Sequence, residues 1–259
     1  MFEKNALGKN ARKMKIQYSS FTLKMIAAVM MIIGTIGVAI VQNGVMDLGN
    51  MSTEMLSKEF ESYGSTFLLA TVSLFCRGVM SLALPIYAFL LIEGFKKTSD
   101  KKKYAIRMLL VAAVSEVPYD LAMQDTWFTM YSQNPMWGIL LAFVVLYFLE
   151  NFENTRKFKG VLLKLIIVVA GILWAIMLNV SYGVGMIMVT AILWLMEGNG
   201  ALTVMGGAVA SLIYFPAPLG FLFNHFYSGE KGKDNRKLFY VIYPVQLLIL
   251  GLVGKYLVH

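Results

Sequence analysis

Cysteine and histidine are nearly absent from this chain, and their scarcity limits the chemistry open to it. The single cysteine, Cys76, cannot form a disulfide within the chain, and it excludes a zinc or iron–sulfur site built on thiolates. The two histidines are His225 and His259, so a mechanism that needs two histidines in one buried site is hard to build. We therefore expect no metal site.

Charged residues are also scarce, at 15% of the chain, whereas 58% of the residues are apolar. Soluble domains carry about 25% charged residues. One helical crossing of a bilayer needs about 20 mostly apolar residues, and such runs recur here. The composition predicts an all-α, polytopic integral membrane protein, a helical bundle of about eight or nine transmembrane segments in the lipid bilayer. The cations lie in loops and form no nucleic-acid-binding face, so we expect no nucleic-acid partner.

The apolar runs predict the positions of the segments. They are expected at 21–42, 65–95, 104–123, 130–149, 160–178, 182–197, 200–214, 216–226 and 238–257. Pro216 and Pro218 remove backbone donors, so 200–226 is either one kinked span or a broken helical pair. The first run is too long for the core of a signal peptide, and we expect it to be a retained span.

Lysine and arginine predict the orientation, because short cytoplasmic loops retain them. The arm of residues 1–20, the loop Lys96–Lys103 and the loop around Lys159 are basic, and they alternate with segments that are not. This alternation places the N-terminus in the cytoplasm. Two crossings or half-crossings within 200–226 keep the basic stretch 231–237 on the same side, which favours nine segments. We expect a cytoplasmic basic arm, 1–20, and a single transmembrane domain, 21–259.

Five ionisable groups fall inside the second and third spans: Arg77, Glu93, Arg107, Glu116 and Asp120. A rise of about 1.5 Å per residue puts Glu93 level with Arg107, and Arg77 level with the two remaining acids. Because buried charges need partners, we expect cross-helix ion pairs, Glu93 with Arg107 and Arg77 with Asp120 or Glu116. The alternative is an outward-facing acidic niche that attracts a cationic group such as an amine.

Two blocks are distinctive: Leu84–Phe95, which reads LPIYAFLLIEGF, and Val114–Ala122, which reads VSEVPYDLA. Further motifs are Tyr104 with Arg107, Phe128-Thr129-Met130, Tyr182-Gly183, Tyr227-Ser228-Gly229, Phe239-Tyr240 and Tyr243-Pro244. Together they resemble the TraX family of membrane proteins, over nearly the whole chain. The family is named after the conjugal-transfer protein that acetylates the N-terminus of F-pilin, which suggests the bacterial inner membrane.

The resemblance implies transfer of an acetyl group from acetyl-CoA, on the cytoplasmic side, to an amine of another membrane protein or a peptide substrate. Glu116 and Asp120 are then candidate catalytic bases. Six cations are candidates for binding the phosphates of the cofactor: Lys96, Lys97, Lys101, Lys102, Lys103 and Arg107. A lysine cluster is equally what a cytoplasmic loop contains for reasons of topology.

Several positions depart from the family pattern. Gly34-Thr35 stand where the family has Asp-His, Ser181 where it often has an acid, and Gln246 where it has the histidine of Tyr-Pro-Leu-His. Glutamine cannot take up a proton near neutral pH. We therefore expect an acetyltransferase-like pseudoenzyme, weakened or catalytically inactive, that acts as a binding or assembly subunit in the cell membrane. The alternatives are an active acetyltransferase using Glu116 or Asp120, and a small-molecule transporter or peptide-binding module.

Overall fold

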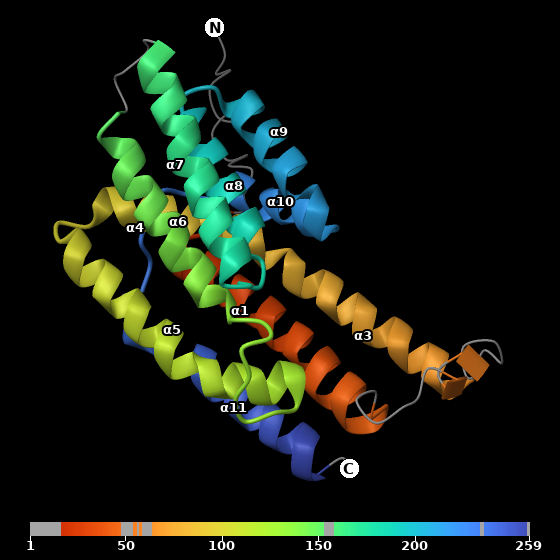
Figure 1. Ribbon diagram of the computed structural model, residues 1–259. Coiled ribbons are helices and arrows are strands. Elements are labelled where there is room, and N and C mark those ends of the chain that lie inside the picture. The colour runs from red at the N-terminus through yellow and green to blue at the C-terminus, as the bar shows by residue number, and fades with distance from the viewer. Residues whose placement is uncertain are drawn as a thin grey trace, which may run out of the picture.

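The computed structural model describes residues 17–47, 54–55, 57–58, 64–152, 158–233 and 236–257. Its elements are α1 (Ser20–Thr35), the π-helix η1 (Ile36–Val45), α3 (Ser65–Ser81), α4 (Ala83–Lys97), α5 (Lys101–Gln124), α6 (Pro135–Glu150), α7 (Phe158–Met177), α8 (Gly183–Leu195), α9 (Gly200–Ser211), η2 (Leu212–Tyr214), η3 (Ala217–Gly220), α10 (Phe221–His225) and α11 (Arg236–Leu257). The predicted all-α membrane bundle is confirmed (Figure 1). Most of the predicted arm, 1–20, lies outside the described residues.

Side-chain caps decide where two of the helices begin. The carboxylate of Asp100 accepts a hydrogen bond from the backbone N–H of Lys103 at 2.9 Å, which starts α5. Asn134 does the same for α6, where its Oδ1 accepts from the N–H of Met136 at 2.9 Å. Pro135 takes the first helical position, where no backbone donor is needed. Because of this cap, the fourth predicted segment begins at 135 and not at 130.

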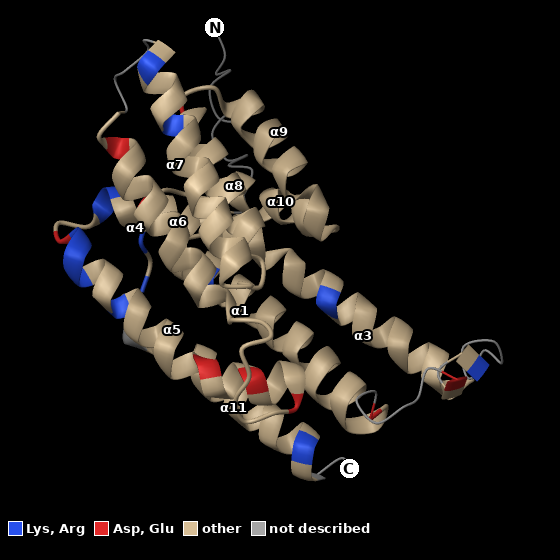
Figure 2. Ribbon diagram, viewed as in Figure 1, with Lys and Arg blue, Asp and Glu red and all other residues tan. Residues whose placement is uncertain are grey.

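The outer faces of the bundle are apolar. In the part of the chain that the structure describes, four helical segments are long and apolar enough to cross a bilayer: Ser20–Val45, Ser65–Lys97, Phe158–Met177 and Leu238–Tyr256. Lysine and arginine gather at the neighbouring ends of α4, α5 and α7 (Figure 2). Large side chains are exposed between the charged ends, such as Phe75, at 71% exposure, and Met177, at 74%. Such faces suit hydrocarbon and not water.

The region 200–226 is a broken helical pair. Glu197, just before it, forms an ion pair with Lys96 at the end of α4. Tyr227, just after it, accepts a hydrogen bond at 3.2 Å from Lys97, the residue that follows Lys96 in α4. The chain therefore leaves and returns on one side of the bundle, with the turn at Pro216. This supports the interpretation of two crossings or half-crossings over that of one kinked span.

Helix α11 lies along α5 and η1 (Figure 1). Small residues make this approach possible, because a Cβ at Gly251 would meet the backbone nitrogen of Ala122 at 2.9 Å. At Gly254 a Cβ would likewise meet the backbone of Ala39. With its far side fixed in this way, α11 turns its other residues toward α1 and α4, and a cavity lies between these helices.

Candidate functional site

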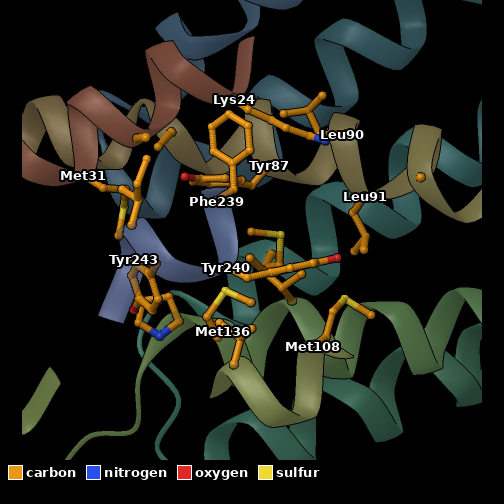
Figure 3. Close-up of a pocket in the computed structure, with 18 of the residues that line it drawn as sticks. Lys24, Met31, Tyr87, Leu90, Leu91, Met108, Met136, Phe239, Tyr240 and Tyr243 are labelled. Carbon is orange, nitrogen blue, oxygen red and sulfur yellow. The ribbon is translucent and has the colours of Figure 1, made fainter. Parts of the chain in front are cut away.

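The cavity has a volume of about 430 Å³, a size typical of small-molecule sites. It is bounded mainly by α1, α4, α5 and α11, with residues of α6 and α8 at its deep side. Most of its lining is apolar, and Leu90, Leu91, Met31, Met108 and Met136 project into it in Figure 3. Polar groups occupy two regions, which we call the basic end and the tyrosine wall.

The basic end consists of Lys24, Lys97, Arg107 and Lys231, with Glu93 as the carboxylate among them. Glu93 and Lys97 lie one turn apart on α4 and form an ion pair at 2.5 Å. The ammonium of Lys24 lies 5.7 Å from the ring centroid of Phe239 (Figure 3). The described lining at this end carries four cations and one carboxylate, on the side where the basic loops lie.

The tyrosine wall consists of Tyr87, Tyr104, Tyr182 and Tyr240, each from a different helix or helix start. Their hydroxyls make no hydrogen bond to the part of the chain that the structure describes. Tyr182 has a φ of 58°, the left-handed conformation that costs a non-glycine residue about 1–3 kcal/mol. Its ring lies 4.8 Å from that of Tyr214, so the strained backbone holds an aromatic pair at the deep side.

Two further polar residues of α11 line the cavity. The hydroxyl of Tyr243 and both amide atoms of Gln246 are buried and make no hydrogen bond to the described residues. Buried polar groups are nearly always paired, so unpaired ones call for an explanation. The tyrosines are site residues that the sequence alone did not indicate. The available signal was that each lies in a block that carries the family resemblance.

The two predicted cross-helix ion pairs do not form. Glu93 and Arg107 both line the cavity, but Glu93 pairs with Lys97. The Nε of Arg107 donates to the backbone oxygen of Lys103 at 3.1 Å. Depth along a helix sets the level of a side chain but not its direction around the axis, and Lys97 is the nearer partner for Glu93 because it lies one turn away.

Arg77 also has a different partner from the one predicted. Its guanidinium donates to the Oε1 of Gln42 at 2.7 Å, and no ion pair among the described residues joins it to Glu116 or Asp120. Helix α3 packs on α1 and η1, so the polar group that Arg77 meets belongs to η1 and not to α5. The prediction treated the second and third spans as direct neighbours at this depth.

Glu116 and Asp120 contact the loop that joins α5 to α6. Glu116 is 9% exposed and accepts from the N–H of Asn134 at 3.2 Å, from Nδ2 of Asn134 at 2.5 Å and from Nε1 of Trp137 at 2.6 Å. Asp120 is fully buried and accepts from the N–H of Thr129 at 2.8 Å. Neither carboxylate lines the cavity. This geometry gives both acids a structural task.

The six predicted phosphate-binding cations separate into two groups. Lys97 and Arg107 line the cavity. The others lie outside its lining: Lys96 pairs with Glu197, Lys101 with Glu150 at 2.5 Å, Lys103 with Asp100 at 3.2 Å, and Lys102 is exposed. The structure adds Lys24 and Lys231, which come from distant parts of the sequence.

The positions that depart from the family pattern are accommodated by local packing. The space that a side chain at residue 34 would need is filled by Met80. Thr35 is fully buried and donates to the backbone oxygen of Met31 at 2.8 Å. Ser181 lies 2.6 Å from the hydroxyl of Tyr119. Gln246 alone among these residues lines the cavity.

Comparison with known proteins gives one match. The model of the family described as TraX protein matches residues 19–254, which include every residue given above as lining the cavity. Neither the curated proteins nor the solved structures contain a match to this chain. Because the matched region spans most of the sequence, the chain belongs to the TraX family of membrane proteins.

Proposed function

We propose that this TraX-family protein binds an acyl thioester of the acetyl-CoA type in its cavity, from the cytoplasmic side of the cell membrane, and that it does so with little or no acetyl transfer. It then serves as a binding or assembly subunit alongside another membrane protein or a peptide. The observation that carries the proposal is the cavity itself, which combines a positive end, a long apolar interior and a lining without histidine.

The charge distribution supports an anionic ligand. Lys24, Lys97, Arg107 and Lys231 lie at one end, and cations placed so attract phosphate groups and hold them by charge-assisted hydrogen bonds. By the distribution of basic loops, this end faces the cytoplasm, where such a cofactor is available. The apolar interior suits the uncharged remainder of the molecule.

Weak or absent catalysis is expected because the described lining holds no histidine and because its carboxylate, Glu93, is paired with Lys97. Acetyl transfer to an amine needs a group that accepts a proton near neutral pH, within hydrogen-bond reach of the amine. Glu116 and Asp120 hold the α5–α6 loop, away from the cavity. Gln246, at the deep side, cannot take up a proton.

Binding is tested with the full-length chain in lipid nanodiscs, by equilibrium binding of radiolabelled acetyl-CoA. Arg107→Gln removes an exposed cation that lines the cavity, and we expect it to weaken binding about 3- to 10-fold. Lys102→Gln is the matched control, because it removes an equally exposed cation of the same helix outside the lining. Failure of the wild-type protein to bind acetyl-CoA would refute the proposal.

Catalysis is tested in the same preparation, by transfer of labelled acetyl to a peptide with a free N-terminus. We expect no transfer by the wild-type protein. One observation favours the rival enzyme: Glu93 is the carboxylate in the cavity lining. If turnover is found and Glu93→Gln abolishes it while Glu116→Gln does not, the protein is an active acetyltransferase with Glu93 as its base.

A further inference from the structure

The tyrosine wall has an arrangement that a positive end and an apolar interior do not explain. Its four residues come from four places in the chain and line one cavity, and their hydroxyls make no hydrogen bond to the described residues. A tyrosine hydroxyl in largely apolar surroundings usually finds a hydrogen-bond partner. Phenylalanine would pack equally well here, so the hydroxyls indicate a ligand that supplies the missing acceptors.

The hydroxyl-bearing residues lie at different depths. Tyr240 is four residues into α11, or about 6 Å from its start, and Tyr104 is a similar distance into α5. Tyr87 lies ten residues from the end of α4 at Lys97, about 15 Å along the helix. Tyr182 lies at the opposite end of the bundle from the basic loops, where α8 begins. Potential donors thus follow the cavity from the basic end inward.

This spacing restricts the chemistry of the ligand. A single polar head group would meet hydroxyls at one level, and a hydrocarbon chain offers no acceptor at any level. A chain that carries carbonyl oxygens at intervals, such as a run of amides that ends in a thioester, offers one acceptor after another. In Figure 3 the hydroxyl of Tyr87 points to the side of Met31, and the hydroxyl of Tyr240 points to the side of Leu91 and Met108.

We propose that the tyrosine wall recognises the amide-bearing arm of the ligand by hydrogen bonds from its hydroxyls to successive carbonyl oxygens. This inference rests on the proposed function, because it assigns the arm of the thioester to a place between the basic end and the deep side. The buried hydroxyl of Tyr243 and the buried amide of Gln246 lie seven and ten residues into α11, or about 10 and 15 Å from its start. At about the depth estimated for Tyr87, the amide of Gln246 is placed to pair with the acyl group.

The test uses fragments of the cofactor and variants that remove single hydroxyls. Pantetheine carries the amides without phosphates, and adenosine 3′,5′-bisphosphate carries phosphates without the arm. Tyr87→Phe and Tyr240→Phe each keep the ring and delete the hydroxyl, and we expect about 3- to 10-fold weaker binding of acetyl-CoA and pantetheine. Binding of the bisphosphate is expected to stay unchanged in both variants and to fall in Arg107→Gln.

Tyr147→Phe is the matched control, since Tyr147 is exposed on α6 outside the cavity lining. If acetyl-CoA binds but both wall variants retain wild-type affinity for pantetheine, the inference is overturned and the proposed function stands. If palmitate binds more tightly than pantetheine, the cavity is a lipid site and the inference is also overturned. If neither acetyl-CoA nor any fragment binds, the proposed function itself fails.

Discussion

Glu116→Ala should destabilise the protein strongly, because this carboxylate holds the start of α6 against α5. It accepts two hydrogen bonds from Asn134, the N-cap of α6, and one from Trp137 in the first turn of α6, and it is almost fully buried. Nδ2 of Asn134 keeps a second acceptor, the backbone oxygen of Ala112 at 2.9 Å. The backbone N–H of Asn134 and the Nε1 of Trp137 have no other acceptor among the described contacts. Two buried donors are therefore left unpaired.

Leaving a buried donor unsatisfied costs about 1–3 kcal/mol, so Glu116→Ala should lower the free energy of unfolding by about 2–5 kcal/mol. Glu116→Gln keeps the shape and one acceptor oxygen, and its loss should be less than half as large. The assay is equilibrium unfolding of the full-length protein in mixed detergent micelles, followed by tryptophan fluorescence. Glu230→Ala, at an exposed carboxylate, is the control and should change stability by less than about 0.5 kcal/mol.

The refuting result is specific. If Glu116→Ala unfolds with the wild-type free energy, the hydrogen bonds to Asn134 and Trp137 do not hold the loop, and the structural role assigned to Glu116 is wrong. If Glu116→Gln is as stable as the wild type but loses an acetyl transfer that the wild type performs, Glu116 is a catalytic group and the cavity is not the whole site. Both variants are therefore measured for stability and for transfer.

Three further predictions concern packing, pH and topology. Gly251→Leu should lower the melting temperature by several degrees, because a Cβ there meets the backbone of Ala122. At Asp100, the N–H of Lys103 lowers the pKa of the carboxyl, so the cap is stabilising above the ordinary pKa of about 4 and is lost as the pH falls through the lowered pKa. Asp100→Ala should therefore speed amide exchange in the first turn of α5 at pH 7, and its difference from the wild type should disappear as the carboxyl becomes protonated. In whole cells, a membrane-impermeant maleimide should label Met130→Cys and not Lys102→Cys.

Each of these predictions has an outcome that contradicts it. Gly200→Leu is the packing control, since nothing lies within 4 Å of a Cβ there, and equal effects at both glycines would remove the argument from helix contact. An exchange difference for Asp100→Ala that persists at low pH would show that the carboxylate is not the cause. Labelling is done in a Cys76→Ser background, and modification of Lys102→Cys from outside would reverse the assigned orientation.

The sequence alone determined that this protein lies in a lipid bilayer, and it determined the order of its helices. Apolar runs of spanning length, separated by charged loops, have few solutions in a bilayer, because backbone groups in hydrocarbon must be paired within a helix. The predicted segments lie within a few residues of helices, with two departures: the segment 65–95 is divided into α3 and α4 at Leu82, and the cap at Asn134 shifts the start of α6 to Pro135. The family was likewise readable from local blocks such as Leu84–Phe95.

Only the tertiary structure decided which polar groups meet. Level along a helix follows from sequence spacing, but direction around the axis and the choice of neighbouring helix depend on packing. Glu93 forms an ion pair with Lys97, Arg77 donates a hydrogen bond to Gln42, and Glu116 accepts hydrogen bonds from Asn134. The tyrosine wall could not be predicted from the sequence for the same reason. Its four residues are far apart in sequence, and they share one cavity because α11, at the end of the chain, lies beside α1, α4 and α5.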